Sequence, residues 1–194
     1  MARRNKRVSD TWTRRAQTEG YAARSVYKLQ ELDERFGILP RKGRVLDLGC
    51  CPGSWSQYIH RKHPQVHLVG IDINPPPSYP GIFIQGSILE LEPATIQTAL
   101  GGPASVVLSD MAPSTTGSRF TDHCRQIELA EQARQLAMDL LRPGGSLAIK
   151  VFDGEDAQAF VARVRAGFQK VKRLRPKATR KESREFFLVG LQRT

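Results

Sequence analysis

Cysteine and histidine are both scarce in this chain. Its 194 residues include three cysteines, of which Cys50 and Cys51 are adjacent and Cys124 stands alone. An odd number of cysteines without paired Cys-x-x-Cys spacing argues against a disulfide framework and a cysteine metal site, so we interpret them as reduced structural thiols. The histidines also lack the spacing of a metal signature; they are His60, His63, His67 and His123. We therefore expect no bound metal.

Long apolar runs are absent as well. No stretch approaches the roughly 20 apolar residues of a membrane span. The basic start at residues 2–7 is not followed by the apolar core of a signal peptide. We therefore expect a cytosolic protein with no membrane association. A chain of 194 residues is long enough for one α/β core and too short for two ordinary domains.

Acidic residues are outnumbered by basic ones. Nineteen Asp and Glu residues oppose 30 Lys and Arg residues, which gives a formal net charge of +11 and a pI near 10.1. Because 40% of the residues are hydrophobic, the composition does not indicate disorder, and the charge favours an anionic partner such as nucleic acid. We expect residues 1–18 to form a flexible basic arm ahead of a single domain over residues 19–194.

Strand-like and helical segments alternate along this domain. Runs rich in Val, Ile and Leu predict strands over residues 44–48, 67–71, 81–85, 105–109, 146–152, 170–174 and 186–191. Amphipathic segments predict helices over residues 21–36, 54–62, 94–100, 122–141 and 156–166. This order predicts an α/β fold with a mostly parallel seven-stranded sheet and helices on both faces. Because no helix separates the last two strands, we expect them to form a terminal antiparallel hairpin.

A glycine-punctuated loop after the first strand indicates a cofactor site. Gly49 and Gly53 let the backbone approach a nucleotide-like ligand, and Asp72 follows about 20 residues later, where an acid can bind ribose hydroxyls. The spacing is Gly-x-x-x-Gly and not the Gly-x-Gly-x-x-Gly of dinucleotide sites. With Asp47 at the end of the strand, this departure favours a cofactor that has an adenosine but no phosphate, of which S-adenosylmethionine is the common one.

Four ionisable residues are candidates for catalysis. Asp110 follows a predicted strand, and Lys150 lies between apolar residues in the next long strand, where an unpaired lysine is costly to bury. Lys28 lies on the polar face of the first helix, and Glu185 opens the last strand. Taken singly, Asp110 is explained as a turn or helix cap, Lys28 as a solvated lysine and Glu185 as an edge charge. The four together favour a functional site.

Several short motifs occur in a fixed order along nearly the whole chain. They are Ala23-Arg24-Ser25, Tyr27-Lys28-Leu29, Asp47-Leu48-Gly49, Pro52-Gly53, Trp55-Ser56-Gln57, Ser109-Asp110-Met111-Ala112-Pro113, Pro143-Gly144-Gly145, Lys150-Val151-Phe152 and Ser183-Arg184-Glu185. In this order they resemble the FtsJ/RrmJ family of ribosomal RNA large-subunit 2'-O-ribose methyltransferases. The resemblance implies a Rossmann-like class I methyltransferase fold, S-adenosylmethionine as cofactor, and a uridine of 23S ribosomal RNA as the target.

The resemblance also implies a catalytic tetrad of Lys28, Asp110, Lys150 and Glu185. Attack of a ribose 2'-hydroxyl on a sulfonium methyl needs in-line placement and removal of the hydroxyl proton. We assign proton removal to Lys150, whose neutral form is favoured by desolvation and by the neighbouring cation Lys28. Asp110 and Glu185 oppose part of this effect, so we expect them mainly to orient the lysines and the hydroxyl.

By the same resemblance, the cofactor contacts the first glycine loop and the ends of neighbouring strands. The residues implied are Asp47, Gly49, Pro52, Gly53, Trp55, Asp72, Ser87 and Asp110. Trp55 is expected to pack beside the cofactor, and Asp110 to lie close to its methionine part. The family commonly has an acid where this chain has Ser87, which accepts a hydrogen bond from the adenine amine without a charge.

The basic residues near the carboxyl end are a candidate RNA-binding surface. They include Lys170, Lys172, Arg173, Arg175, Lys177, Arg180, Lys181 and Arg184. Together with the basic arm they are expected to flank the site and contact phosphates of ribosomal RNA or the large ribosomal subunit. We expect a monomer, because no heptad pattern or exposed apolar stripe indicates an obligate dimer.

Alternative functions share parts of this pattern. A 2'-O-methyltransferase of transfer RNA or of the messenger RNA cap uses the same tetrad. A non-catalytic RNA-binding or ribosome-assembly protein keeps the fold but does not need Lys150. A nicotinamide dehydrogenase requires the glycine spacing that this chain lacks. The Asn-Pro-Pro sequence at residues 74–76 resembles a motif of amino-group methyltransferases but follows the wrong strand, so we interpret it as a rigid loop.

Overall fold

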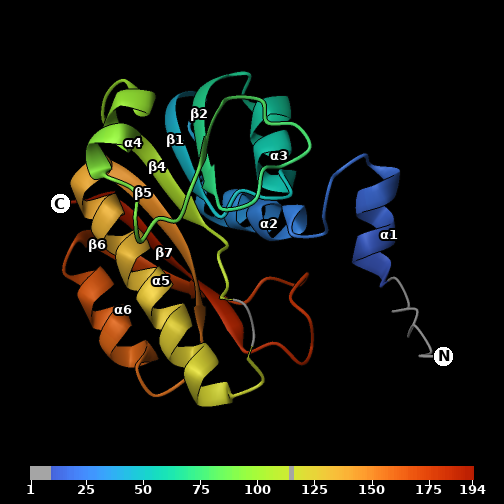
Figure 1. Ribbon diagram of the computed structural model, residues 1–194, viewed down its shortest axis with the longest axis vertical. Helices are drawn as coiled ribbons and strands as arrows, with labels where there is room; N and C mark the ends of the chain where they lie inside the picture. The colour runs from blue at the N-terminus through green and yellow to red at the C-terminus, as the bar shows by residue number, and fades with distance from the viewer. Residues whose placement is uncertain (1–9, 114–115) are drawn as a thin grey trace.

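A seven-stranded sheet lies at the centre of the structure, in the order β3-β2-β1-β4-β5-β7-β6 (Figure 1). The computed structural model describes residues 10–113 and 116–194. The strands are β1 (Lys42–Leu48), β2 (Gln65–Asp72), β3 (Ile82–Gln85), β4 (Ala104–Ser109), β5 (Leu141–Phe152), β6 (Phe168–Leu174) and β7 (Glu185–Arg193). The first five pair in parallel, and β7 runs antiparallel between β5 and β6. The predicted α/β class and its terminal hairpin are therefore confirmed.

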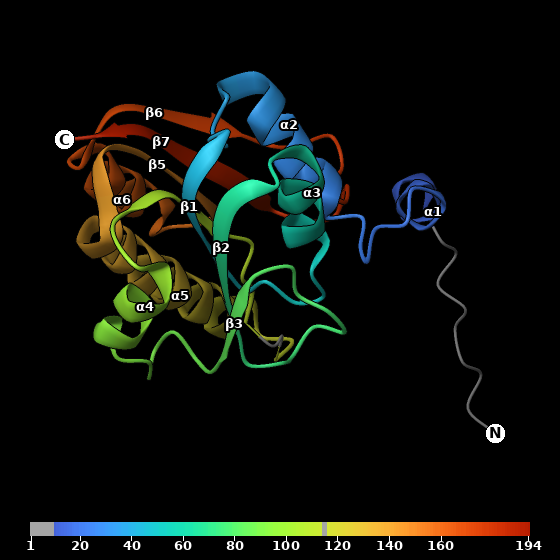
Figure 2. The same ribbon diagram turned by 90° about the horizontal axis from the view of Figure 1, so that it is seen from above.

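Among the described residues, five helices cover the two faces of this sheet, and a sixth, α1, lies to one side of it (Figure 1). They are α1 (Thr11–Thr18), α2 (Val26–Phe36), α3 (Ser54–Lys62), α4 (Pro93–Leu100), α5 (Arg119–Leu140) and α6 (Ala157–Arg165). In Figure 2, α2 and α3 lie on one face, while α4, α5 and α6 lie on the other. Within the described ranges, no helix has the length and apolar character needed to cross a membrane.

Alternation along the strands divides the buried residues into two cores. Successive side chains of a strand point to opposite faces, so Leu46 and Leu48 join the core under α4, α5 and α6, while Val45 joins the core under α2 and α3. The same division separates Phe186 from Phe187 on β7. Both faces of the sheet are thereby buried, which explains why its strands contain nearly continuous apolar runs.

The amino-terminal region differs from the expectation of a flexible arm over residues 1–18. Residues 11–18 form α1, because the Asp10 carboxylate caps the helix by accepting from the Thr13 N–H at 2.8 Å. Trp12 packs on the Tyr27 ring with centroids 5.1 Å apart, and Asp10 forms an ion pair with Arg24. Residues 1–9 lie outside the described part of the chain.

Several element boundaries also differ from the predicted ones, two of them by five residues. The helix predicted over residues 21–36 begins at Val26, because the preceding backbone bonds to α3 instead. The Ala22 N–H donates to Gln57 and the Ser25 carbonyl accepts from Trp55. The turn at residues 143–145 lies within β5 as a shift in its register with β4.

Asp33 connects the end of α2 to α3. Its buried carboxylate accepts from the Leu39 N–H at 3.0 Å and from the Tyr58 hydroxyl at 3.3 Å, and it pairs with Lys62. Gly37, with φ at 58°, ends α2 in the left-handed conformation and lets the chain turn back toward Asp33. This network fixes the helix that carries Lys28.

We predict that Asp33→Ala lowers the free energy of unfolding by about 2 to 3 kcal/mol, because it leaves the buried N–H of Leu39 without an acceptor. Urea denaturation measures this loss. The matched control is Glu34→Ala at the next, exposed position of the same helix, with an expected change within about 0.5 kcal/mol. Equal losses in the two variants would contradict the role of Asp33.

Candidate active site

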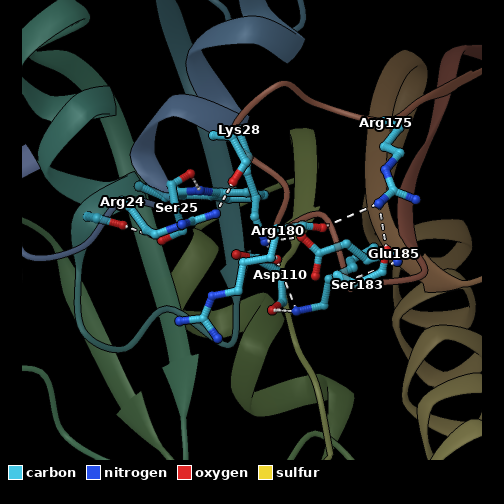
Figure 3. Close-up of polar contacts among 12 residues, drawn as sticks. Arg24, Ser25, Lys28, Asp110, Arg175, Arg180, Ser183 and Glu185 are labelled. Atoms are coloured by element: carbon cyan, nitrogen blue, oxygen red, sulfur yellow. Dashed lines mark hydrogen bonds and ion pairs between the residues drawn. The ribbon is translucent and has the colours of Figure 1, made fainter. Parts of the chain in front are cut away.

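The four residues of the expected tetrad lie together at one edge of the sheet. Figure 3 labels three of them, Lys28, Asp110 and Glu185. The Lys28 Nζ lies 2.6 Å from the Glu185 Oε1 and 3.4 Å from the Asp110 Oδ1. The Lys150 Nζ lies 3.0 Å from the same Asp110 oxygen, and it also donates to the backbone carbonyl of Asp110. The charges therefore alternate from Lys150 through Asp110 and Lys28 to Glu185.

Sheet topology explains how residues so distant in sequence meet. Because β4 and β5 are parallel neighbours, their carboxyl ends reach the same edge, and this places Asp110 beside Lys150. Strand β7 is antiparallel to β5 and enters the sheet at that edge, so Glu185 lies opposite Phe152. Helix α2 crosses the face of the sheet and brings Lys28 to the same point.

Burial and ion pairing have opposing effects in this cluster. Burial disfavours the carboxylate of Asp110, but Lys150 and Lys28 outweigh that penalty and hold the pKa of Asp110 below its usual value. Burial likewise disfavours the ammonium of Lys28, but Asp110 and Glu185 outweigh it and raise the pKa of Lys28. Lys28 is therefore held in its charged form. The effect that we expect its charge to have on Lys150 acts across the Asp110 carboxylate, which both lysines contact.

A cavity of about 380 Å³ adjoins the tetrad. It is lined by Gly49, Cys51, Ile71, Asp72, Ile73, Asn74, Gly86, Ser87, Ile88, Asp110, Met111, Ala112, Pro113 and Leu129. Four of the residues expected to bind a cofactor are in this set, namely Gly49, Asp72, Ser87 and Asp110. Asp110 belongs to both the cavity and the tetrad, so a ligand in the cavity lies beside the two lysines.

The glycine loop packs tightly against the segment after β4. Gly49 has φ at 75°, and a Cβ atom there would lie 2.4 Å from the Cγ of Met111. Any larger residue would push this loop away from Met111, which also lines the cavity. The loop is fixed on its other side by Ile71, whose carbonyl accepts from the N–H groups of Gly49 and Cys50.

Asp72 and Ser87 present polar groups to the cavity. The two carboxylate oxygens of Asp72 accept from the N–H groups of Cys51 and Asn74, both at 2.9 Å, and each oxygen retains a lone pair for a ligand hydroxyl. The Ser87 Oγ accepts from the Leu89 N–H at 3.2 Å, which leaves its hydroxyl proton free to be donated. These positions suit a ligand that has a ribose and a base.

Four residues expected to contact the cofactor lie outside the lining of this cavity: Asp47, Pro52, Gly53 and Trp55. Trp55 is 3% exposed, donates to the Ser25 carbonyl at 2.8 Å and packs on Phe187, so it supports the core between α3 and the sheet. Its contact with a cofactor stays a prediction. Sequence reasoning did not single out Ile73, which directly follows Asp72, or Leu129, which has no local signal on α5.

Asp47 is buried at the end of β1, just before the glycine loop. It is 1% exposed, and its Oδ2 has no hydrogen-bond partner among the described residues. Burial raises the pKa of Asp47 to about 8, with smaller contributions from Asp110 and Asp72. Asp47 is two residues before Gly49, which lines the cavity, and an unpaired carboxyl oxygen here suits a ligand group that donates a hydrogen bond.

Sequence and structure comparisons identify relatives of this chain. Residues 21–193 match the family described as FtsJ-like methyltransferase. Ribosomal RNA large subunit methyltransferase E of Rhizorhabdus wittichii is 44% identical over 187 residues, which cover 95% of this chain and 82% of the relative. The protein of the same name from Desulfosudis oleivorans is 41% identical over 194 residues, which cover 98% and 93%.

A solved structure is also similar to this chain. It is a crystal structure from Plasmodium falciparum, described as a ribosomal RNA methyltransferase, with a TM-score of 0.81 and 28% sequence identity. The similarity covers 89% of this chain and 98% of that chain.

We predict that Asp47→Asn changes the pH dependence of stability. The folded protein retains a proton on Asp47 up to about pH 8, whereas the unfolded chain loses it near pH 4. Stability therefore falls as pH rises through this window, by at most about 1.4 kcal/mol per pH unit, and asparagine removes this slope. Urea denaturation of the cofactor-free protein across this window measures the difference between variant and wild type.

The control is Asp139→Asn, at an exposed position of α5. Its stability is expected to follow the wild-type pH dependence. If the Asp47→Asn curve also ran parallel to that of the wild type, the carboxyl group of Asp47 would be ionised throughout and the prediction would be wrong.

Proposed function

Because this chain belongs to the FtsJ-like methyltransferase family, we propose that it methylates a ribose 2'-hydroxyl of large-subunit ribosomal RNA, with a uridine of 23S RNA as the target. The observation that carries the proposal is the cluster of Lys28, Asp110, Lys150 and Glu185 beside a nucleoside-sized cavity. A ribose hydroxyl is weakly acidic, and two lysines and two carboxylates are the groups needed to orient and deprotonate it.

The cavity supports S-adenosylmethionine as the methyl donor. When bound, this cofactor supplies a methyl group on a positively charged sulfur. Asp72 is the residue we assign to the ribose hydroxyls, and Ser87 the residue near the base. Asp47, with its unpaired oxygen, and Asp110 provide acceptors for the amino acid part. The loop around Gly49 can approach the cofactor closely, because glycine has no side chain at this position.

Lys150 is the group we assign to proton removal. Acting as the neutral amine, Lys150 takes the proton of the 2'-hydroxyl as the oxygen attacks, and the resulting ammonium is stabilised by the Asp110 oxygen 3.0 Å away. Lys28 remains a cation, held by Glu185 at 2.6 Å, and lies within reach of the same hydroxyl oxygen. Asp110 thus keeps both lysines aimed at the target.

The connection between β6 and β7 is the part of the RNA-binding surface that lies nearest the tetrad. It docks on α2 through the Lys177 N–H, which donates to Glu31 at 2.7 Å, and through Arg24, which donates to the Ala178 carbonyl. Its exposed basic residues are Arg175, Lys177, Arg180, Lys181 and Arg184. Figure 3 labels Arg180 in the same close-up as Asp110 and Glu185, and we expect a phosphate next to the target ribose to approach from this connection.

All four tetrad residues and the cavity come from one chain. We therefore infer that the protein acts as a monomer, and that it works in the cytosol, where its RNA substrate is assembled into ribosomes.

The proposed function predicts methyl transfer from labelled S-adenosylmethionine to large-subunit RNA, measured on isolated large subunits, free 23S RNA and transfer RNA. Lys150→Ala is expected to lower kcat by at least about 100-fold with little change in cofactor affinity, because the proton acceptor is lost. The control is Lys42→Ala, at an exposed lysine near the opposite end of β1. Labelled methyl groups on transfer RNA alone would contradict ribosomal RNA as the substrate. Absence of label from every RNA would favour a non-catalytic RNA-binding protein.

We also predict that RNA affinity falls steeply with salt. The double variant Arg180→Ala/Lys181→Ala is expected to reduce the slope of log K against log salt concentration by about 2, because each phosphate contact contributes roughly one unit. The adjacent exposed pair Arg41 and Lys42 offers the matched control, replaced by alanine in the same way. Equal slopes for the two double variants would remove the β6–β7 connection from the RNA-binding surface.

A further inference from the structure

Strand β5 continues beyond the end of its neighbour β4. The pairing of the two strands stops at Ser109 opposite Ile149, where the chain leaves the sheet at Asp110. On its other side, β5 stays paired with β7 as far as Phe152. The backbone groups of Lys150 and Phe152 that point toward β4 have therefore lost their strand partner, and buried backbone groups need one.

Gln126 of α5 supplies both missing partners. Its side-chain Nε2 donates to the Lys150 carbonyl at 2.7 Å, and its Oε1 accepts from the Phe152 N–H at 3.1 Å. In a parallel sheet, one residue of the adjacent strand donates to a carbonyl and accepts from the N–H two residues further on. The carboxamide of Gln126 makes this same pair of bonds, so it takes the place of a β4 residue.

The amide is held in one orientation. Gln126 is 1% exposed, so water does not compete for either bond. Rotating the amide by half a turn would place its oxygen against a carbonyl and its NH2 group against an N–H. A glutamine is therefore specified at this position by the two backbone groups that it faces.

This arrangement bears directly on the tetrad. Because β4 ends early, Asp110 is free to turn both its carboxylate and its backbone carbonyl toward the Lys150 Nζ. The backbone of Lys150 is then held by β7 on one side and by Gln126 on the other. We propose that Gln126 is a positioning residue that holds Lys150 against Asp110 for proton removal, an inference that rests on the proposed function.

The test uses Gln126→Glu, which keeps the size and shape of the side chain. As a carboxylate it accepts from Phe152 but repels the Lys150 carbonyl, whereas the protonated acid has a hydroxyl that donates to this carbonyl. We expect kcat for RNA methylation to be at least about tenfold below wild type at high pH, because small displacements of a catalytic group slow the reaction. The ratio of variant to wild-type kcat is expected to rise as pH is lowered.

Two measurements separate positioning from a general loss of structure. The dissociation constant of S-adenosylmethionine is expected to stay within about twofold of wild type, because Gln126 does not line the cavity. Gln126→Met, which makes neither bond, is expected to lower kcat at every pH without recovery. The control is Gln135→Glu, which makes the same change at an exposed position of α5 and is expected to leave kcat and its pH profile unchanged.

A readout without RNA keeps the inference independent of the proposed function. Loss of the bond to Gln126 is expected to speed hydrogen exchange at the Phe152 amide, and displacement of Lys150 to shift the resonance of its side-chain carbons. Both changes should occur in Gln126→Met, and neither should occur in Gln135→Glu. If wild type methylates no RNA but these shifts occur, the proposed function fails and the contact with Lys150 stands. Wild-type kcat in Gln126→Met, or an unshifted Lys150 resonance, would overturn the inference.

Discussion

The carboxylate of Asp110, shared by two lysines, is the interaction on which the rest of the site depends. Two lysine side chains are buried together at one sheet edge, and Asp110 is the anion that contacts both. Lys28 also has Glu185 as a partner, so removing the Asp110 carboxylate would leave Lys150 without its carboxylate partner. The same carboxylate borders the cavity. In the function proposed above, this single side chain therefore contacts both the cofactor cavity and the two lysines that orient the nucleophile.

Strand β4 ends at Ser109, directly before Asp110, and this lets Asp110 turn toward Lys150. A strand that continued would direct the Asp110 backbone into the sheet, where its carbonyl could not face Lys150. The early end of β4 leaves backbone groups of β5 without a strand partner and requires close packing where the chain turns away. A specific residue accommodates each of these. Gln126 satisfies the unpaired backbone of β5, and the absence of a side chain at Gly49 leaves room for Met111 where the chain turns away.

Much of this could be predicted from local patterns. Runs rich in Val, Ile and Leu predicted the strands, and the absence of a helix before the last strand predicted its antiparallel pairing, since both can be read from short stretches of sequence. Other features depend on tertiary contacts that no local pattern contains. Gln126 looks like any polar residue of an amphipathic helix until β5 is seen beside it. Helix α1 looked like a basic arm because its stability comes from Trp12 and Asp10 contacting α2 and the turn before it.

The position of β7 also affects how the protein is made. Strand β7 is the last of the seven in the chain, yet it lies between β5 and β6 in the sheet. During synthesis, both neighbours exist before it and have unpaired edges, which can pair with the wrong strand. The strand that closes this gap also delivers Glu185 to Lys28. Completion of the sheet and assembly of the active site are consequently the same event, so a nascent chain has no active form until its folding is finished.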